Sequence, residues 1–140
     1  MIRKAAFAAS LAAALAFAGA AFAGKTSGSS SIAGPYLVAA SSTGSQLTAT
    51  STSTPHYLDT ITFSVSTTAT NQPFVNLVCY QGGALALNSW DAYFGPLSGQ
   101  TFVLGSGMWA GGAADCTAYL GMDTSNKYKV LASTSFHVDA

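Results

Sequence analysis

Hydrophobic and polar residues alternate over much of the chain beyond residue 55. Ile61, Phe63 and Val65 are separated by Ser and Thr, which is the period of a strand with one buried face. Apolar stretches predict further strands from Tyr36 onward and at residues 74–80, 85–93, 100–104, 113–120 and 127–138. Beyond residue 23, none of these stretches keeps a helical period. The pattern therefore predicts an all-β fold.

Turn residues separate the expected strands. Gly82-Gly83 predicts a tight hairpin, because glycine tolerates the positive φ angles that hairpin turns need. The Ser/Thr-rich segment 41–54 is interpreted as a loop or a polar edge strand, with a glycosylated stalk as the weaker alternative. About seven short strands, spaced about ten residues apart, predict an immunoglobulin-like or fibronectin-like Greek-key sandwich.

The first 23 residues have a different character. Arg3 and Lys4 precede an Ala-rich apolar run that ends in Ala21-Phe22-Ala23, the pattern of a signal peptide cleaved after Ala23. A membrane anchor is the weaker alternative, because Ala dominates the run and Gly19 interrupts it. We therefore expect a signal peptide at 1–23, a flexible leader at 24–34, one domain at 35–140, and a secreted or periplasmic product.

Charge excludes several kinds of partner. Residues 24–140 contain three lysines and five aspartates, which gives a net charge of −2. They form no basic patch for nucleic acid or an anionic membrane. No cysteine stands directly after the expected cleavage site to accept a lipid, so no membrane anchor is expected. No cofactor is expected either.

The chain has two cysteines, Cys79 and Cys116, and both lie in the part expected to be exported. An even count in an oxidising compartment favours one structural disulfide. A redox pair or half of a metal site is disfavoured, because there is no CxxC spacing and only two histidines.

A disulfide between neighbouring strands requires both sulfurs on the same face. If that face is the core, alternation buries Val75, Leu77, Ala118, Leu120, Ile61, Phe63, Val65, Phe102, Leu104, Tyr128 and Val130. The same parity turns Phe74, Asn76, Val78 and Tyr80 outward beside Asp115, Thr117 and Tyr119. Exposed aromatic residues often mark contact surfaces, so Tyr80, Tyr119, Trp90 and Phe74 are the candidate binding face. The open alternative is that a loop or a second subunit covers these rings, whereas Trp109 is expected to plug the end of the core.

Catalytic and metal motifs are missing from the sequence. There is no GxSxG elbow and no Glu, and the five aspartates show neither a DxD nor a calcium-loop pattern. The fold would have to assemble a hydrolytic site from Asp59, Asp91 and Asp115. His56 and His137 are expected to be structural or solvated, because two ligands without a third make a poor metal site. No catalytic or metal residue is therefore assigned.

Several stretches resemble a family of small Ig-like domains of bacterial exported and phage proteins. They are Pro55-His56-Tyr57, the run 62–68, Val78-Cys79-Tyr80-Gln81, the run 109–116 and the run 131–137. The resemblance covers about residues 55–138, implies a sandwich and carries no active site. The usual Ig disulfide joins the second and sixth strands, whereas Cys79 lies on the expected third strand. A staple between adjacent strands of one sheet is therefore inferred.

Three classes of function remain. The first is a non-enzymatic module that binds an extracellular protein or glycan, or serves a structural role at the cell exterior. The second is a secreted protease inhibitor acting through a loop such as residues 95–100, and the third is a weak hydrolase. A homodimer is a further open alternative.

Overall fold

The computed structural model describes residues 28–39, 53–95 and 99–140. The expected signal peptide at 1–23 and most of the Ser/Thr-rich segment lie outside these residues, as does part of the expected inhibitory loop. The described residues form strands, turns and loops, and none of them belongs to a helix that could span a bilayer.

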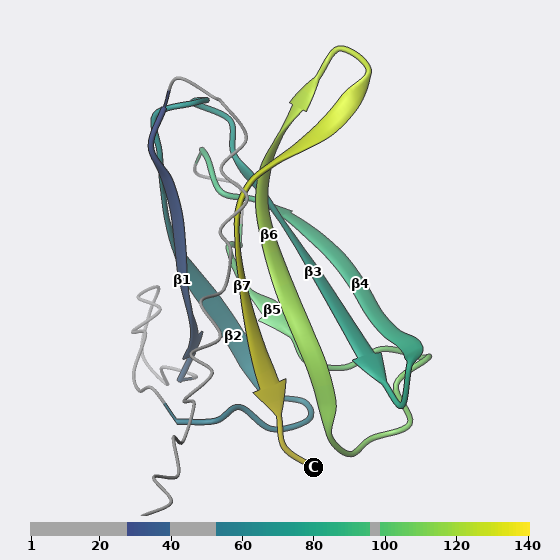
Figure 1. Cartoon of the computed structure of the whole chain (residues 1–140). Helices are drawn as coiled ribbons and strands as arrows, with labels where there is room; N and C mark the ends of the chain where they lie inside the picture. Colours follow the sequence, from purple (N-terminus) through teal and green to yellow (C-terminus); the bar gives the residue numbers. More distant parts are fainter. Residues whose placement is uncertain (1–27, 40–52, 96–98) are drawn as a thin grey trace, which may run out of the picture.

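Seven strands of the described chain form two antiparallel sheets (Figure 1). One sheet has the order β1-β2-β5 and the other has the order β4-β3-β6-β7. The strands are β1 (Ser30–Leu37), β2 (Thr60–Thr67), β3 (Phe74–Gln81), β4 (Ala84–Ala92), β5 (Phe102–Val103), β6 (Ala114–Thr124) and β7 (Lys127–Val138). The predicted hairpin is confirmed, because Gly82 and Gly83 connect β3 to β4 with φ angles of 57° and 84°.

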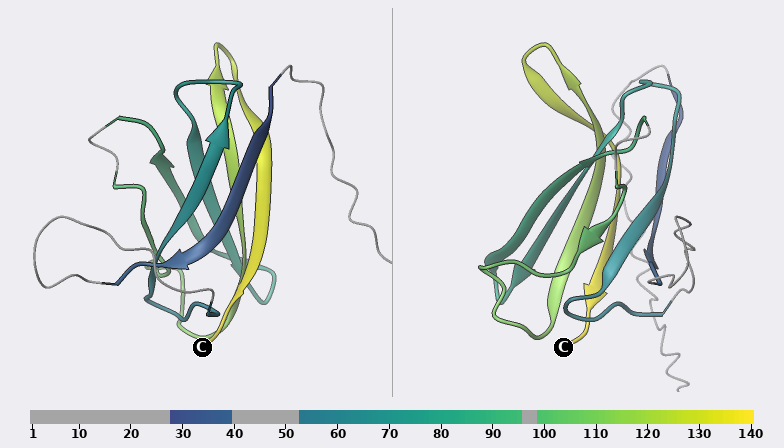
Figure 2. Two further views of the ribbon diagram at one scale, coloured as in Figure 1. Left: turned by 90° about the vertical axis from the view of Figure 1, so that its left-hand side faces the viewer. Right: turned by 180° about the vertical axis from the view of Figure 1, so that it is seen from behind.

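The two sheets face each other in a sandwich-like arrangement (Figure 2). Inward residues of both sheets share one core, which contains Ile61, Phe63, Val75, Leu77, Leu87, Phe102, Leu104, Ala118 and Leu120. Most of the predicted core is therefore confirmed, and Val65 packs against it half-buried. Burying a side chain of this size contributes about 1.5–3 kcal/mol.

The disulfide forms between adjacent strands of one sheet, as inferred from the sequence. Cys79 on β3 lies directly opposite Cys116 on β6, and both side chains are buried. The bond therefore belongs to the core side of the sheet, and the outward parity of its neighbours follows.

The structure corrects the last five residues of the leader expected at 24–34, of which residues 24–27 lie outside the described residues. Strand β1 begins at Ser30, pairs along β2, and buries Ile32 partly against the core. A polar segment is held there by backbone pairing and by hydroxyls, because Ser30 Oγ and Thr67 Oγ1 are 2.7 Å apart. Residues 30–34 are thus part of a sheet.

The structure also corrects Tyr128 and Val130, which were expected in the core. Leu120 pairs with Ala132 but Gly121 pairs with Val130, so Leu131 is an extra residue on β7. Such a bulge reverses the alternation along the strand. Val130 is accordingly exposed and Tyr128 is only half-buried.

Trp109 is buried, as expected for a residue that closes the core. Its ring packs against Tyr57 with centroids 5.5 Å apart, and its indole Nε1 donates to the Gly112 carbonyl at 3.1 Å. The loop between β5 and β6 is therefore anchored by its tryptophan.

Candidate binding face

The outward side of the four-stranded sheet brings all four candidate contact residues onto one surface. Strand register places Asn76 between Trp90 on β4 and Tyr119 on β6. Phe74, two residues before Asn76 on β3, and Tyr80, four residues after it, lie on the same side. We call this surface the aromatic face and define it by Phe74, Tyr80, Trp90, Tyr119 and Tyr128.

Trp90 is the most prominent ring of the aromatic face. Its side chain is 51% exposed, although it packs edge-on against Tyr128 with centroids 4.6 Å apart. An edge-to-face pair of this kind contributes about 0.5–1.5 kcal/mol beyond burial. The indole is therefore held in place while a large part of its surface stays open to solvent.

Tyr128 reaches across the sheet from β7. Its hydroxyl donates to the Tyr119 carbonyl at 2.9 Å, and its ring lies over Gly121, where a Cβ atom would overlap the ring. Burial, followed by the nearby Asp123 carboxylate, raises the pKa of Tyr128 to about 12. The phenol therefore stays neutral and keeps its hydrogen bond at physiological pH.

The remaining rings differ in exposure. Phe74 packs edge-on against Phe94, with centroids 5.3 Å apart, and is half-buried, as is Tyr119. Tyr80 is as open as Trp90, with 50% of its surface exposed. Tyr80 and Trp90 thus offer the most contact area on this face.

Asn76 lies at the centre of the aromatic face and is buried, although alternation turns it outward. Its Nδ2 donates to Asn88 Oδ1 at 2.8 Å and to the Ser89 carbonyl at 3.3 Å. A buried amide requires such partners, because an unpaired one costs about 1–3 kcal/mol. These bonds tie the Asn76 side chain on β3 to β4 on either side of the Trp90 position.

The face becomes polar toward the end of β7. Thr117 and Ser135 are joined by a hydroxyl contact of 2.9 Å, and the next row carries Asp115 opposite His137. His137 Nδ1 lies 2.8 Å from Asp115 Oδ1, and its Nε2 lies 3.6 Å from Asp139 Oδ1. Tyr80 is the cross-strand neighbour of Asp115, so its phenol adjoins the contact between Asp115 and His137.

Tyr128 is the aromatic residue that sequence reasoning left out of the face. Strict alternation along 127–138 placed it in the core, and the bulge at Leu131 moved it outward. The clue was present in the sequence, because Val130, Leu131 and Ala132 are three consecutive apolar residues.

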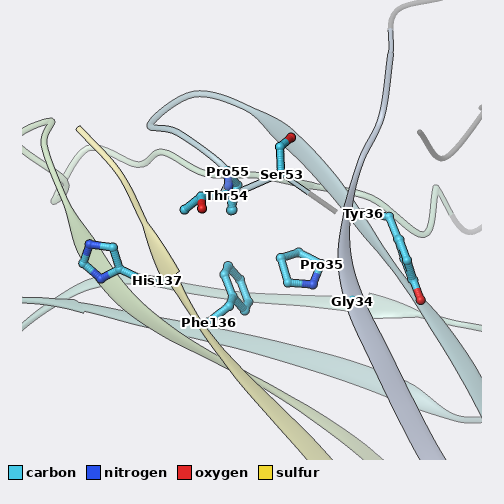
Figure 3. Close-up of a pocket in the computed structure, with 8 residues that line it drawn as sticks. All are labelled: Gly34, Pro35, Tyr36, Ser53, Thr54, Pro55, Phe136 and His137. Carbon is cyan, nitrogen blue, oxygen red and sulfur yellow. The ribbon is translucent and has the colours of Figure 1, made fainter. Parts of the chain in front are cut away.

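A pocket of about 370 Å³ lies away from the aromatic face, between β1 and β7 (Figure 3). The Phe136 ring and Pro35 are turned toward one another, with residues 53–55 above them and His137 across β7. Its lining contains none of the four candidate contact residues. Sequence reasoning did not identify this pocket.

The aspartates considered for hydrolysis lie in separate networks. Asp59 Oδ2 accepts from the His56 backbone N–H at 2.7 Å, Asp91 Oδ2 accepts from the Thr101 N–H at 3.2 Å, and Asp115 contacts His137. Within the described parts of the chain, no three His, Cys, Asp or Glu side chains are grouped so that they could hold a metal ion.

Comparison with known proteins yields no relative. No protein-family model, curated protein or solved structure matches the chain. The aromatic face must therefore be interpreted from its own chemistry.

Proposed function

We propose that this chain is an exported, non-enzymatic Ig-like module that binds an extracellular protein or glycan through its aromatic face. The observation that carries the proposal is the open, edge-packed Trp90 beside Tyr128 on the outward side of a disulfide-stapled sheet. Aromatic rings bring large contact area at little cost in conformational entropy, which is why they dominate binding hot spots.

The order of the strands supports an Ig-like Greek-key topology. The order β1-β2-β5 is the one expected for Ig strands A, B and E, and β4-β3-β6-β7 is the one expected for C′, C, F and G. The sequence resemblance to small Ig-like domains of exported proteins points the same way. The disulfide is consistent with an oxidising compartment and so supports export.

A rigid surface supports binding for an energetic reason. The Trp90 indole is braced by Tyr128, and Tyr128 is in turn bonded to the Tyr119 carbonyl. A partner that covers these rings does not have to order them, so less of the binding free energy is lost to entropy. Asp115 and His137, at the polar end of the face, would determine how such a partner is oriented.

The test is a binding screen of the purified protein against polysaccharides, cell-envelope fractions and extracellular proteins. We expect a saturable partner whose affinity falls at least about tenfold in Trp90→Ala and in Tyr80→Ala, the loss typical of a hot spot. Met108→Ala is the matched control, because Met108 is 62% exposed but lies on the loop between β5 and β6. Equal affinities in all three variants would overturn the assignment of this face.

Extracellular proteases belong in the same panel, because a secreted inhibitor is the alternative function. In that case the loop at 95–100 would enter the protease active site. Inhibition that survives Trp90→Ala but is lost on changing that loop would favour the alternative.

A further inference from the structure

One edge of the four-stranded sheet is only partly protected against strand addition. Free edges of natural sheets are blunted by prolines, lysines, covering segments or very short strands. Among the described strands, β1 carries Pro35, β5 has two residues, and β7 carries Lys127 and Lys129 and lies alongside β1. Strand β4 has neither proline nor lysine, and Figure 1 shows no other strand beyond it. Its first half is protected by a bulge at Ala86, whose carbonyl accepts from Ser106 Oγ of the β5–β6 loop, so residues 88–92 are the open part of this edge.

The alternation of the hydrogen bonds between β3 and β4 shows which backbone groups of β4 point away from β3, toward the free edge of the sheet. The Tyr93 N–H donates to the Pro73 carbonyl at 2.9 Å, which makes these residues a hydrogen-bonded pair. Because such pairs alternate along an antiparallel ladder, the backbone groups of Asn88, Trp90 and Ala92 point away from β3.

The disulfide gives an independent check of this alternation. In the same alternation, the backbone N–H and C=O of Cys79 point toward β4. Cys79 should therefore form a non-hydrogen-bonded pair with Cys116 on β6. Its Cα atom lies 4.0 Å from that of Cys116, which fits the closer spacing of such pairs.

We propose that β4 pairs antiparallel with β4 of a second copy of this chain, about a two-fold axis at Trp90. This register matches Trp90 with Trp90 and Asn88 with Ala92, so each outward-facing pair exchanges two backbone hydrogen bonds. This register also places Asp91, the only charged residue of β4, opposite Ser89 of the second copy. A register centred on residue 91 would instead place the two Asp91 carboxylates opposite each other, which is unfavourable.

A dimer of this kind enlarges the aromatic face. A two-fold axis perpendicular to the sheet keeps both outward sides on the same surface, so the two copies form one eight-stranded sheet. The Trp90 rings meet at its centre, and part of their exposed surface is covered there. The pairing needs no other partner, so it stands or falls separately from the proposed binding function.

The first experiment measures the mass of the purified protein in solution by sedimentation equilibrium over a dilution series. We expect a reversible dimer whose dissociation constant rises at least about tenfold in Asn88→Pro, because proline removes the N–H that faces the second copy. Asn88→Ala is the matched control, since it also loses the contact with Asn76 but keeps the N–H. A wild-type protein that stays monomeric up to its solubility limit would overturn the proposal.

A crosslink tests the register without relying on proline. In Trp90→Cys the two new thiols face each other across the axis, within the Cα spacing that a disulfide needs, so oxidation should yield a covalent dimer. Val130→Cys is the control, because Val130 is exposed on the same side of the sheet but on β7. Equal crosslinking of the two variants, or none in Trp90→Cys, would refute the proposed register.

Discussion

Gly121 decides where the Tyr128 ring can lie. The ring occupies the space that a side chain at 121 would fill, and from there it reaches both the Tyr119 carbonyl and the Trp90 indole. A single missing Cβ atom thus allows β7 to contribute to a surface whose most prominent ring, Trp90, lies on β4. At the scale of the residue, the aromatic face depends on this glycine as much as on its rings.

Gly121→Ala should displace the Tyr128 ring and break its packing on Trp90. We expect the free energy of unfolding to fall by about 1–3 kcal/mol, the usual cost of overpacking. Denaturant unfolding measures the loss, and near-UV circular dichroism reports the change around the rings. Gly107→Ala is the control, because nothing lies within 4 Å of a Cβ there, and it should change stability by less than about 0.5 kcal/mol.

Two tyrosines should make the protein sensitive to alkali. Burial raises the pKa of Tyr93 to about 12, and burial together with Asp123 does the same for Tyr128. Unfolding restores the ordinary value of 10.0, so the folded state holds these protons longer. The stabilisation is complete below pH 10.0 and is lost as the pH rises toward about 12.

Denaturant unfolding at a series of pH values tests this expectation. Between pH 10 and 12 the stability should fall less steeply in Tyr93→Phe and in Tyr128→Phe than in the wild type, because each variant lacks one titrating phenol. Three parallel curves would contradict a role for these two groups.

At the scale of the element, alternation predicted strands where nothing interrupts it. Ile61, Phe63 and Val65 predicted β2 because its inward and outward residues differ throughout. The same pattern failed on β7, since nothing but a run of apolar residues marks the bulge at Leu131. It also missed the start of β1, because Ser30 and Ser31 are held by pairing with a distant strand.

The candidate site was predictable to a similar extent. The disulfide fixed the parity of β3 and β6, and parity placed Phe74, Tyr80 and Tyr119 on one side. Parity could not show that Asn76 would be buried, because the partners that satisfy its amide, Asn88 and Ser89, lie on the neighbouring strand β4. The pocket beside Phe136 was also beyond prediction, since its walls come from strands far apart in the sequence.

The disulfide should contribute much of the stability of its sheet. It closes a loop with a sequence separation of 37, for which the chain-entropy model gives about 4 kcal/mol. We expect the double variant Cys79→Ala/Cys116→Ala to lose about that much free energy of unfolding, as measured by denaturant titration. A loss below about 1 kcal/mol would mean that the packing of β3 on β6 is sufficient without the bond.

At the scale of the whole molecule, the inward and outward sides of the two sheets have different roles. Their inward sides form the core, which is closed at one end by Trp109, and the outward side of the four-stranded sheet carries the aromatic face. The pocket between β1 and β7 lies at the junction of the sheets and uses other residues. Binding at the aromatic face and at the pocket can therefore be distinguished by experiment.

The two tryptophans provide the most direct test of the central claim. Trp90 is exposed on the aromatic face, whereas Trp109 is 3% exposed and its indole N–H is bonded to the Gly112 carbonyl. The two indole N–H signals in a ¹H–¹⁵N spectrum can be followed while a partner from the binding screen is added. We expect the Trp90 signal to shift and the Trp109 signal to stay in place. A saturable partner that leaves Trp90 unchanged and shifts the backbone signals of Tyr36 and Phe136 would contradict the account and place binding at the pocket.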